Sequence, residues 1–208
     1  MTSRLAHLPP ARLDDAQVAL YDVIAHGRRA GGESQFLLTN EDGSLTGPFN
    51  AMLYAPRLGH ALQAVGEAIR FESSIPPRGR ELAILTVASH WRSDFEWYAH
   101  EAAARRLGVA DTVLIALADG VAPPFDDPVD AVIHDHCLAL LRRQPIDEES
   151  YRRTVAVLGE PTIVELTVLV GYYTTLATLL EVFQVGVPEG PSPFADNRHR
   201  PLSEHAEG

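Results

Sequence analysis

The sequence contains no lysine, because all 17 basic residues are arginine. This absence excludes Schiff-base catalysis, lysine-bound pyridoxal phosphate and a P-loop nucleotide site, each of which needs a lysine amine. Cys137 is the only cysteine. The chain therefore forms no internal disulfide, no Cys-x-x-Cys redox pair and no thiolate zinc site.

Positive charge is also scarce, and the chain has a formal net charge of −11 and a sequence pI of about 5.2. An acidic protein repels nucleic acids and anionic membrane surfaces, so the composition predicts neither as a partner. An anionic small molecule would need a local group of arginines to overcome this field.

Long uncharged apolar runs are missing as well. The N-terminus lacks the apolar stretch of a signal peptide. The most hydrophobic segment, residues 163–187, is interrupted by Glu165 and Glu181, and the stretch between them is shorter than the roughly 20 residues of a membrane span. We expect a soluble cytoplasmic protein that does not enter membranes.

Apolar residues make up 46% and charged residues 22% of the 208 residues, which is typical of one globular domain. Helical periodicity recurs along the chain and no segment alternates like a strand. We predict an all-α fold of roughly eight helices in one domain over residues 1–208. Its parts are an N-terminal helix over 14–29, a core over about 47–187 and an extended polar tail over 188–208. The expected core helices cover about 47–55, 58–71, 109–118, 130–143, 147–158 and 161–183, with one more that starts after Pro76 and Pro77 and runs to Trp91 and another that begins at Ser93.

The segment S-D-F-E-W-Y-A-H, Ser93 to His100, combines a hydroxyl, a carboxylate and an imidazole on one helical stripe. S-x-x-E is the pattern of a capping box, in which Ser93 and Glu96 would bind each other's backbone N–H groups. Capping does not account for His100, which lies one turn further along. The spacing thus leaves open a helix start, a buried histidine and a reactive site.

The surrounding segment, P-P-R-G-R-E-L-A-I-L-T-V-A-S-H-W-R-S-D-F-E-W-Y-A-H-E-A-A-A-R-R-L-G-V, resembles the core of the carboxymuconolactone decarboxylase family, which includes alkyl hydroperoxidase D. The earlier G-P-F-N-A-M-L-Y-A-P-R-L and the late V-E-L-T-V-L-V-G-Y-Y-T-T-L-A-T-L-L-E-V-F are similar to the family's lead-in and closing helix. The resemblance covers roughly residues 47–185 and implies an alkyl hydroperoxidase D-like helical fold.

Peroxidase members of this family carry a glutamate, eleven residues, a C-x-x-C pair, three residues and a histidine. On this chain the glutamate is Glu81 and the histidine is His100, while Ser93 and Glu96 occupy the cysteine positions. Without two thiols, thiol peroxidase chemistry is not expected. The resemblance instead implies a cofactor-independent decarboxylase-like lyase that acts by acid–base catalysis on a small carboxylated lactone or a related unsaturated acid.

By this resemblance His100 is the expected proton donor, tuned by Glu81 or Glu96. Arg80 is expected to hold a carboxylate or oxyanion, with Arg78 in reserve. Trp97, Phe95 and Trp91 are candidates for the walls of a dry pocket. The remaining candidates for substrate contact are Ser93, Asn50 and Tyr54.

Other functions remain open from the sequence. The same acid–base groups suit an isomerase, a dehydratase or a cyclase. Glu81, Glu96 and His100 form a donor set that a metal ion accepts, although no metal is predicted. The chain is alternatively a non-catalytic helical binding protein. The family resemblance implies a homo-oligomer, with a trimer or hexamer favoured, and a small, anionic substrate.

Overall fold

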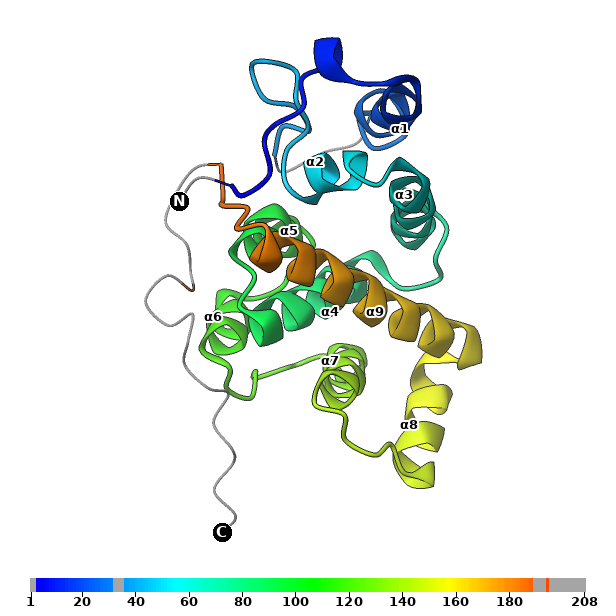
Figure 1. Cartoon of the computed structure of the whole chain (residues 1–208). Helices are drawn as coiled ribbons and strands as arrows, with labels where there is room; N and C mark the ends of the chain where they lie inside the picture. The colour runs from blue at the N-terminus through cyan, green and yellow to red at the C-terminus, as the bar shows by residue number, and fades with distance from the viewer. Residues whose placement is uncertain (1–2, 32–35, 189–193, 195–208) are drawn as a thin grey trace.

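The computed structural model describes residues 3–31, 36–188 and 194, and these residues form nine α-helices and one short 3-10 helix, η1 (Pro10–Arg12). Figure 1 shows α1 to α3 at one end of the molecule, α4 to α6 in the middle and α7 and α8 at the other end, with α9 crossing them. The bounds are α1 Asp15–Ala25, α2 Pro48–Leu53, α3 Pro56–Phe71, α4 Pro77–Trp91, α5 Asp94–Arg106, α6 Asp111–Asp119, α7 Pro128–Leu141, α8 Glu148–Leu158 and α9 Glu160–Val182.

No strand occurs among the described residues, which contain only an isolated bridge between Thr39 and Leu45. The all-α prediction is confirmed. The expected count of roughly eight helices is close to the nine that the described part of the chain contains. Proline stands in the first turn of α2, α3, α4, α7 and α9, where its missing N–H costs nothing and its fixed φ suits a helix.

Helix α4 is the centre of the fold and packs against α5, α7 and α9. It is buried almost all round, and Leu82 and Leu85 lie on the α5–α6 side while Ile84 and Val87 lie on the α9 side. A helix buried on every side has no single apolar face, so it presents polar residues only where they face a cavity or a partner. Glu81 is such a residue.

The start of α5 corrects the sequence-based prediction of a capping box. Ser93 precedes α5, but its side chain makes no capping hydrogen bond, and its buried Oγ has no hydrogen-bond partner among the described residues. Ser93 has a ψ of 98°, which is lower than that of the residues whose side chains do cap a helix: 172° at Asp14, 119° at Asp127 and 168° at Asp147. The Glu96 carboxylate faces His100, so it does not reach back to the helix start.

Helix α9 is, among the described helices, the one long and apolar enough to span a membrane by length and composition, with a mean hydropathy of 1.6. Glu165 and Glu181 therefore do not make the apolar stretch too short to span a membrane, contrary to the expectation from the sequence. Half of the apolar window is buried in the protein, where α9 packs on α4, α7 and α8. Buried core helices of soluble proteins have the same composition, so this feature alone is weak evidence for a membrane.

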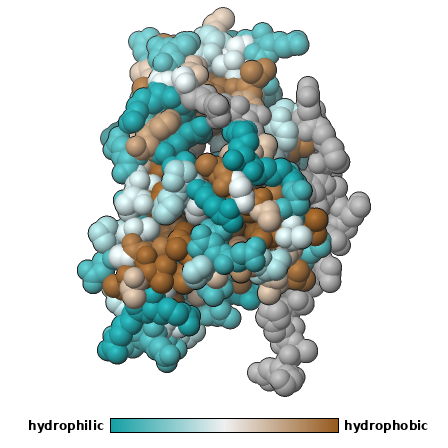
Figure 2. Space-filling model, turned by 180° about the vertical axis from the view of Figure 1, so that it is seen from behind, coloured by the Kyte–Doolittle hydropathy of each residue, from teal (hydrophilic) through white to brown (hydrophobic). Residues whose placement is uncertain are grey.

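The predicted polar tail lies mostly outside the described residues. Phe194 is described and is fully buried, with its ring 5.5 Å from that of Trp97 and 4.7 Å from the Arg92 guanidinium carbon. This residue therefore packs on the core. Figure 2 shows the opposite face of the molecule, where apolar side chains gather in patches among hydrophilic ones.

Candidate active site

A cavity of about 500 Å³ lies beside α4 and α5. Helices α3 and α9 and the segment between α1 and α2 complete its wall. Apolar side chains form somewhat more than half of the wall, and charged or phenolic side chains form the rest. The charged and phenolic residues of the wall are Arg29, Arg70, Arg80, Arg106, Glu81, Glu96, His100, Tyr172 and Tyr173.

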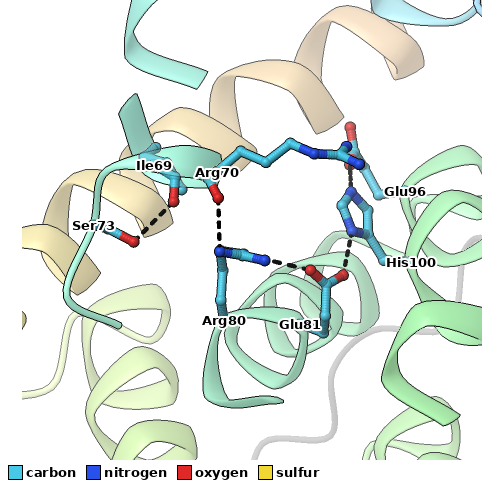
Figure 3. Close-up of polar contacts among 7 residues, drawn as sticks. All are labelled: Ile69, Arg70, Ser73, Arg80, Glu81, Glu96 and His100. Atoms are coloured by element: carbon cyan, nitrogen blue, oxygen red, sulfur yellow. Dashed lines mark hydrogen bonds and ion pairs between the residues drawn. The ribbon is translucent and has the colours of Figure 1, made fainter. Parts of the chain in front are cut away.

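His100 lies between two carboxylates in this cavity. Its Nδ1 is 2.7 Å from Glu81 Oε2, and its Nε2 is 3.8 Å from Glu96 Oε2 (Figure 3). Glu96 and His100 are four residues apart on α5 and so share one face, while Glu81 comes from α4. We refer to Glu81, His100 and Glu96 as the Glu–His–Glu cluster.

Glu81 is the ionised member of the cluster. Burial opposes its charge, but His100, Arg80 and Arg70 together hold the pKa of the Glu81 carboxyl below its usual value. Arg80 Nε lies 3.5 Å from Glu81 Oε1, and Arg80 also donates a hydrogen bond of 2.8 Å to the carbonyl of Arg70. An ionised Glu81 accepts from the Nδ1–H of His100, which leaves Nε2 to face Glu96 and the cavity.

Glu96 is shifted in the opposite direction. Its side chain is only 4% exposed, and burial raises the pKa of this carboxyl to about 7, although the nearby His100 and Arg29 counteract part of the shift. Two carboxylates beside one imidazole thus favour opposite protonation states near neutral pH. Such divergence marks the acid and base roles in many active sites, and it also occurs in structural ion pairs.

Two tyrosines of α9 close the cavity behind the imidazole. The Tyr173 ring meets the His100 ring edge to face at 5.4 Å and fixes its orientation. Burial raises the pKa of Tyr172 to about 12 and that of Tyr173 well above its usual value. Both phenols are therefore neutral near pH 7 and able to donate hydrogen bonds.

The structure brings together four of the residues singled out in the sequence, because Arg80 lines the cavity beside the Glu–His–Glu cluster. Phe95 also contributes to the wall. The reserve candidate Arg78 has another role: it pairs with Asp130 at 2.7 Å and donates to the carbonyl of Gly108.

The other candidates lie outside the cavity wall. Trp97 packs in the core against Phe194, and Trp91 is half-exposed and hydrogen-bonded to Thr174. Ser93 is buried at the start of α5.

Asn50 and Tyr54 both hold the N-terminal segment. Asn50 accepts from the backbone N–H of Leu8 and donates to the carbonyl of Ala6, and the Tyr54 hydroxyl donates to the same carbonyl. The lead-in motif that suggested these two residues thus performs a structural task.

Sequence reasoning did not find Arg29, Arg70, Tyr172 and Tyr173. Arg29 follows α1, Arg70 is near the end of α3 and the tyrosines are in the middle of α9, so only the fold brings them together. The tyrosine pair in an otherwise aliphatic helix was the signal available, since a buried phenol needs a polar partner.

The thiol and metal possibilities find no support in the geometry. Cys137 lies on α7 outside the cavity wall, and burial raises the pKa of its thiol to about 12. Such a thiol is not a nucleophile near neutral pH. Within the described part of the chain, no three His, Cys, Asp or Glu side chains are arranged to hold a metal ion.

The fold and the cavity define an all-helical protein with an acid–base cluster in a partly buried cavity. Residues 56–131 match the model of the carboxymuconolactone decarboxylase family. The matched segment runs from α3 into α7 and contains Arg70, Arg80 and the whole Glu–His–Glu cluster, but not Arg29 or the two tyrosines.

Solved structures with the same fold include two of the debrominase Bmp8. A cysteine-to-alanine variant in complex with 2,3,4-tribromopyrrole has a TM-score of 0.66 and 13% identity, over 94% of this chain and 96% of that chain. The apo form has a TM-score of 0.64 and 13% identity, over 91% and 93%. At this identity the likeness establishes the fold alone. No curated protein has significant sequence similarity to the chain.

Proposed function

We propose that this protein is an acid–base lyase that removes carbon dioxide from a small carboxylated lactone or a related unsaturated acid. The observation that carries the proposal is the Glu–His–Glu cluster, in which an ionised carboxyl and a carboxyl with a pKa of about 7 face one imidazole inside the cavity. The match of residues 56–131 to the carboxymuconolactone decarboxylase family supports the same class of reaction.

The reaction needs one proton and no external electrons. The bond between the ring carbon and the carboxylate breaks, carbon dioxide leaves, and the electron pair moves into the unsaturated lactone as an enolate. A proton then adds to carbon and restores the carbonyl. The protein stabilises the enolate oxygen and delivers the proton, which are tasks for positioned donors in a site from which water is excluded.

His100 is the proposed proton donor through Nε2, the nitrogen that Glu81 leaves unoccupied. Glu96 supplies the next proton, because its carboxyl is half protonated near pH 7. The separation of 3.8 Å between Nε2 and Glu96 exceeds a hydrogen bond, so a substrate atom or a water is needed to bridge them. Arg80 holds Glu81 in its ionised form and is not committed to substrate in this arrangement.

An isomerase is the second candidate, and the opposite protonation of Glu81 and Glu96 favours it. A site with a base and an acid on one imidazole can remove a proton from one carbon and return it to another. Such a reaction leaves the composition of the substrate unchanged, so carbon dioxide release separates it from the lyase.

The test is a panel of unsaturated lactone carboxylic acids incubated with the purified protein in D₂O. Release of carbon dioxide with one deuteron incorporated at carbon is expected for the lyase, whereas deuterium exchange without release identifies the isomerase. His100→Ala should lose at least a hundredfold in rate with its fold intact. Glu149→Gln, which removes an exposed carboxylate on α8, is the matched control and should keep full activity. A panel that shows neither release nor exchange would overturn both candidates.

A further inference from the structure

Arg29 is a buried guanidinium with an unused donor. The residue is 8% exposed and lines the cavity, and its Nη2 has no hydrogen-bond partner among the described residues. Its Nε donates to Gln63 Oε1 at 2.8 Å, and its guanidinium carbon lies 5.5 Å from the centre of the Phe49 ring. The Nε side of the guanidinium is therefore fixed, while Nη2 has no hydrogen bond to any residue that the structure describes.

A buried charge without a counterion is costly, and proteins pair nearly all of them. No carboxylate of the described residues lies within ion-pair distance of Arg29. Glu96 is near enough to feel its charge, yet with a pKa of about 7 Glu96 is only about half ionised near neutral pH. Among the described residues, none forms an ion pair that neutralises the positive charge of Arg29.

The packing keeps space around this guanidinium. A Cβ added at Gly66 of α3 would overlap both Arg29 Nη2 and the Tyr172 hydroxyl, so glycine at this position allows the two groups to lie side by side. The Tyr172 hydroxyl, which is neutral near pH 7, lies against the Arg29 guanidinium at the same place.

The cavity is positive although the molecule is acidic. Four arginines reach its wall against two glutamates, while the whole chain has a net charge of −11. Arg29 also repels the charge of Arg70, whose pKa is lowered by burial and then by Arg29. An anion placed among these groups would relieve the repulsion and supply the missing counterion.

We propose that Arg29, assisted by the Tyr172 hydroxyl, forms a carboxylate-binding subsite that selects a small unsaturated or aromatic carboxylate as the ligand of this cavity. This subsite would position the substrate of the proposed lyase, and in this respect the proposal rests on the proposed function. It assigns anion recognition to a residue outside the family-matched segment and replaces Arg80 in that role. The flat apolar walls supplied by Phe36, Phe49 and Phe95 suit a planar body.

The test is direct binding by calorimetry at constant ionic strength, with cinnamate and its neutral isostere cinnamamide as probes. The full-length wild type should bind cinnamate at least tenfold more tightly than cinnamamide. Arg29→Gln should lose this preference while its affinity for cinnamamide changes less than threefold. Gly66→Ala, which displaces Nη2, should weaken cinnamate binding in the same direction. Arg57→Gln, an exposed arginine on α3, is the control and should bind as the wild type does.

The proposal is overturned if wild type binds both probes equally or binds neither at millimolar concentration. It is also overturned if a folded Arg29→Gln, verified by circular dichroism and cooperative unfolding, keeps the tenfold preference. These outcomes do not depend on turnover. Failure of the lactone panel with the preference intact would reject the proposed reaction and retain the subsite.

Discussion

At the scale of single residues, the decisive contrast is between Glu81 and Glu96. Both contact the same imidazole, but Glu81 is also paired with Arg80, whereas Glu96 is fully enclosed by the protein. Ion pairing favours a carboxylate and burial favours a carboxylic acid, so the two groups titrate in different ranges. The difference can be measured without a substrate.

We predict that the stability contributed by Glu96 declines with rising pH. Its pKa is raised from 4.5 to about 7, so the folded state binds more protons than the unfolded state between these values. The contribution is complete below pH 4.5 and is lost as the pH rises through about 7, by about 3 kcal/mol at roughly 1.4 kcal/mol per unit. In urea unfolding, the unfolding free energy of the wild type should therefore fall relative to that of Glu96→Gln as the pH rises across this range.

The control for this measurement is Glu149→Gln, whose difference from wild type should stay flat over the same pH range. If the difference between wild type and Glu96→Gln is also flat, Glu96 is ionised throughout. Its role as a proton source in the proposed lyase would then fail.

At the scale of helices, the first turns of α1 and α5 show that a sequence pattern does not guarantee a cap. Asp14 accepts from Gln17 N at 2.9 Å and its own N–H donates to Gln17 Oε1 at 3.0 Å, a complete capping box. We predict that Asp14→Ala costs about 1 kcal/mol of unfolding free energy, whereas Ser93→Ala changes it by less than about 0.5 kcal/mol. Urea denaturation of both variants measures this difference. A loss of 1 kcal/mol or more for Ser93→Ala would mean that Ser93 caps α5 after all.

The start of α2 depends on backbone geometry. Gly47 has a φ of 57° and a ψ of −140°, a combination that residues with a Cβ rarely adopt, and an added Cβ would overlap the Phe95 ring. We predict that Gly47→Ala lowers the unfolding free energy by about 2 kcal/mol or more and displaces Phe95 from the cavity wall. Gly120→Ala, also at positive φ but in open space, is the matched control and should cost less. Equal losses would show that backbone strain alone, and not contact with Phe95, sets the cost.

Helix positions could be predicted from the sequence because they depend on local signals, namely periodicity, proline in first turns and glycine after last turns. Glu81, Glu96 and His100 were identified through the family resemblance, because its motif lies on α4 and α5, which are adjacent in sequence. Arg29 and Tyr172 could not be found this way, since 143 positions separate two groups that only the packing of α3 and α9 brings together. The missing cap at Ser93 was equally out of reach, because its backbone conformation is set by the tight link from α4.

At the scale of the whole molecule, the N-terminal segment joins distant parts of the fold. Arg4 donates from its backbone and from its guanidinium to the carbonyls of Phe183 and Val182 at the end of α9, and Asn50 holds Ala6 and Leu8. The region before the family-matched segment therefore contributes Arg29 to the cavity and ties both ends of the described chain together.

Helix α9 also presents an exposed face with a heptad spacing. The residues are separated by four, three, four, three and four positions, as in the seam of a coiled coil, and are Val164, Val168, Gly171, Thr175, Thr178 and Val182. The hydroxyls of Thr175 and Thr178 bond to carbonyls one turn back, so they need no partner outside the helix. An added Cβ at Gly171 would meet nothing, which leaves room for close approach of another backbone.

We predict that this seam pairs with a second copy of the chain and contributes to the homo-oligomer expected from the family. Val168, in the middle of the seam, is 47% exposed, and burying such side chains along 23 residues of helix stabilises association. Light scattering coupled to size exclusion should find an oligomer for wild type and a smaller species for Val168→Glu with unchanged helicity. Val157→Glu places the same charge at a valine 41% exposed on α8 and should leave the mass unchanged. A monomeric wild type, or equal dissociation by both substitutions, would contradict an interface on α9.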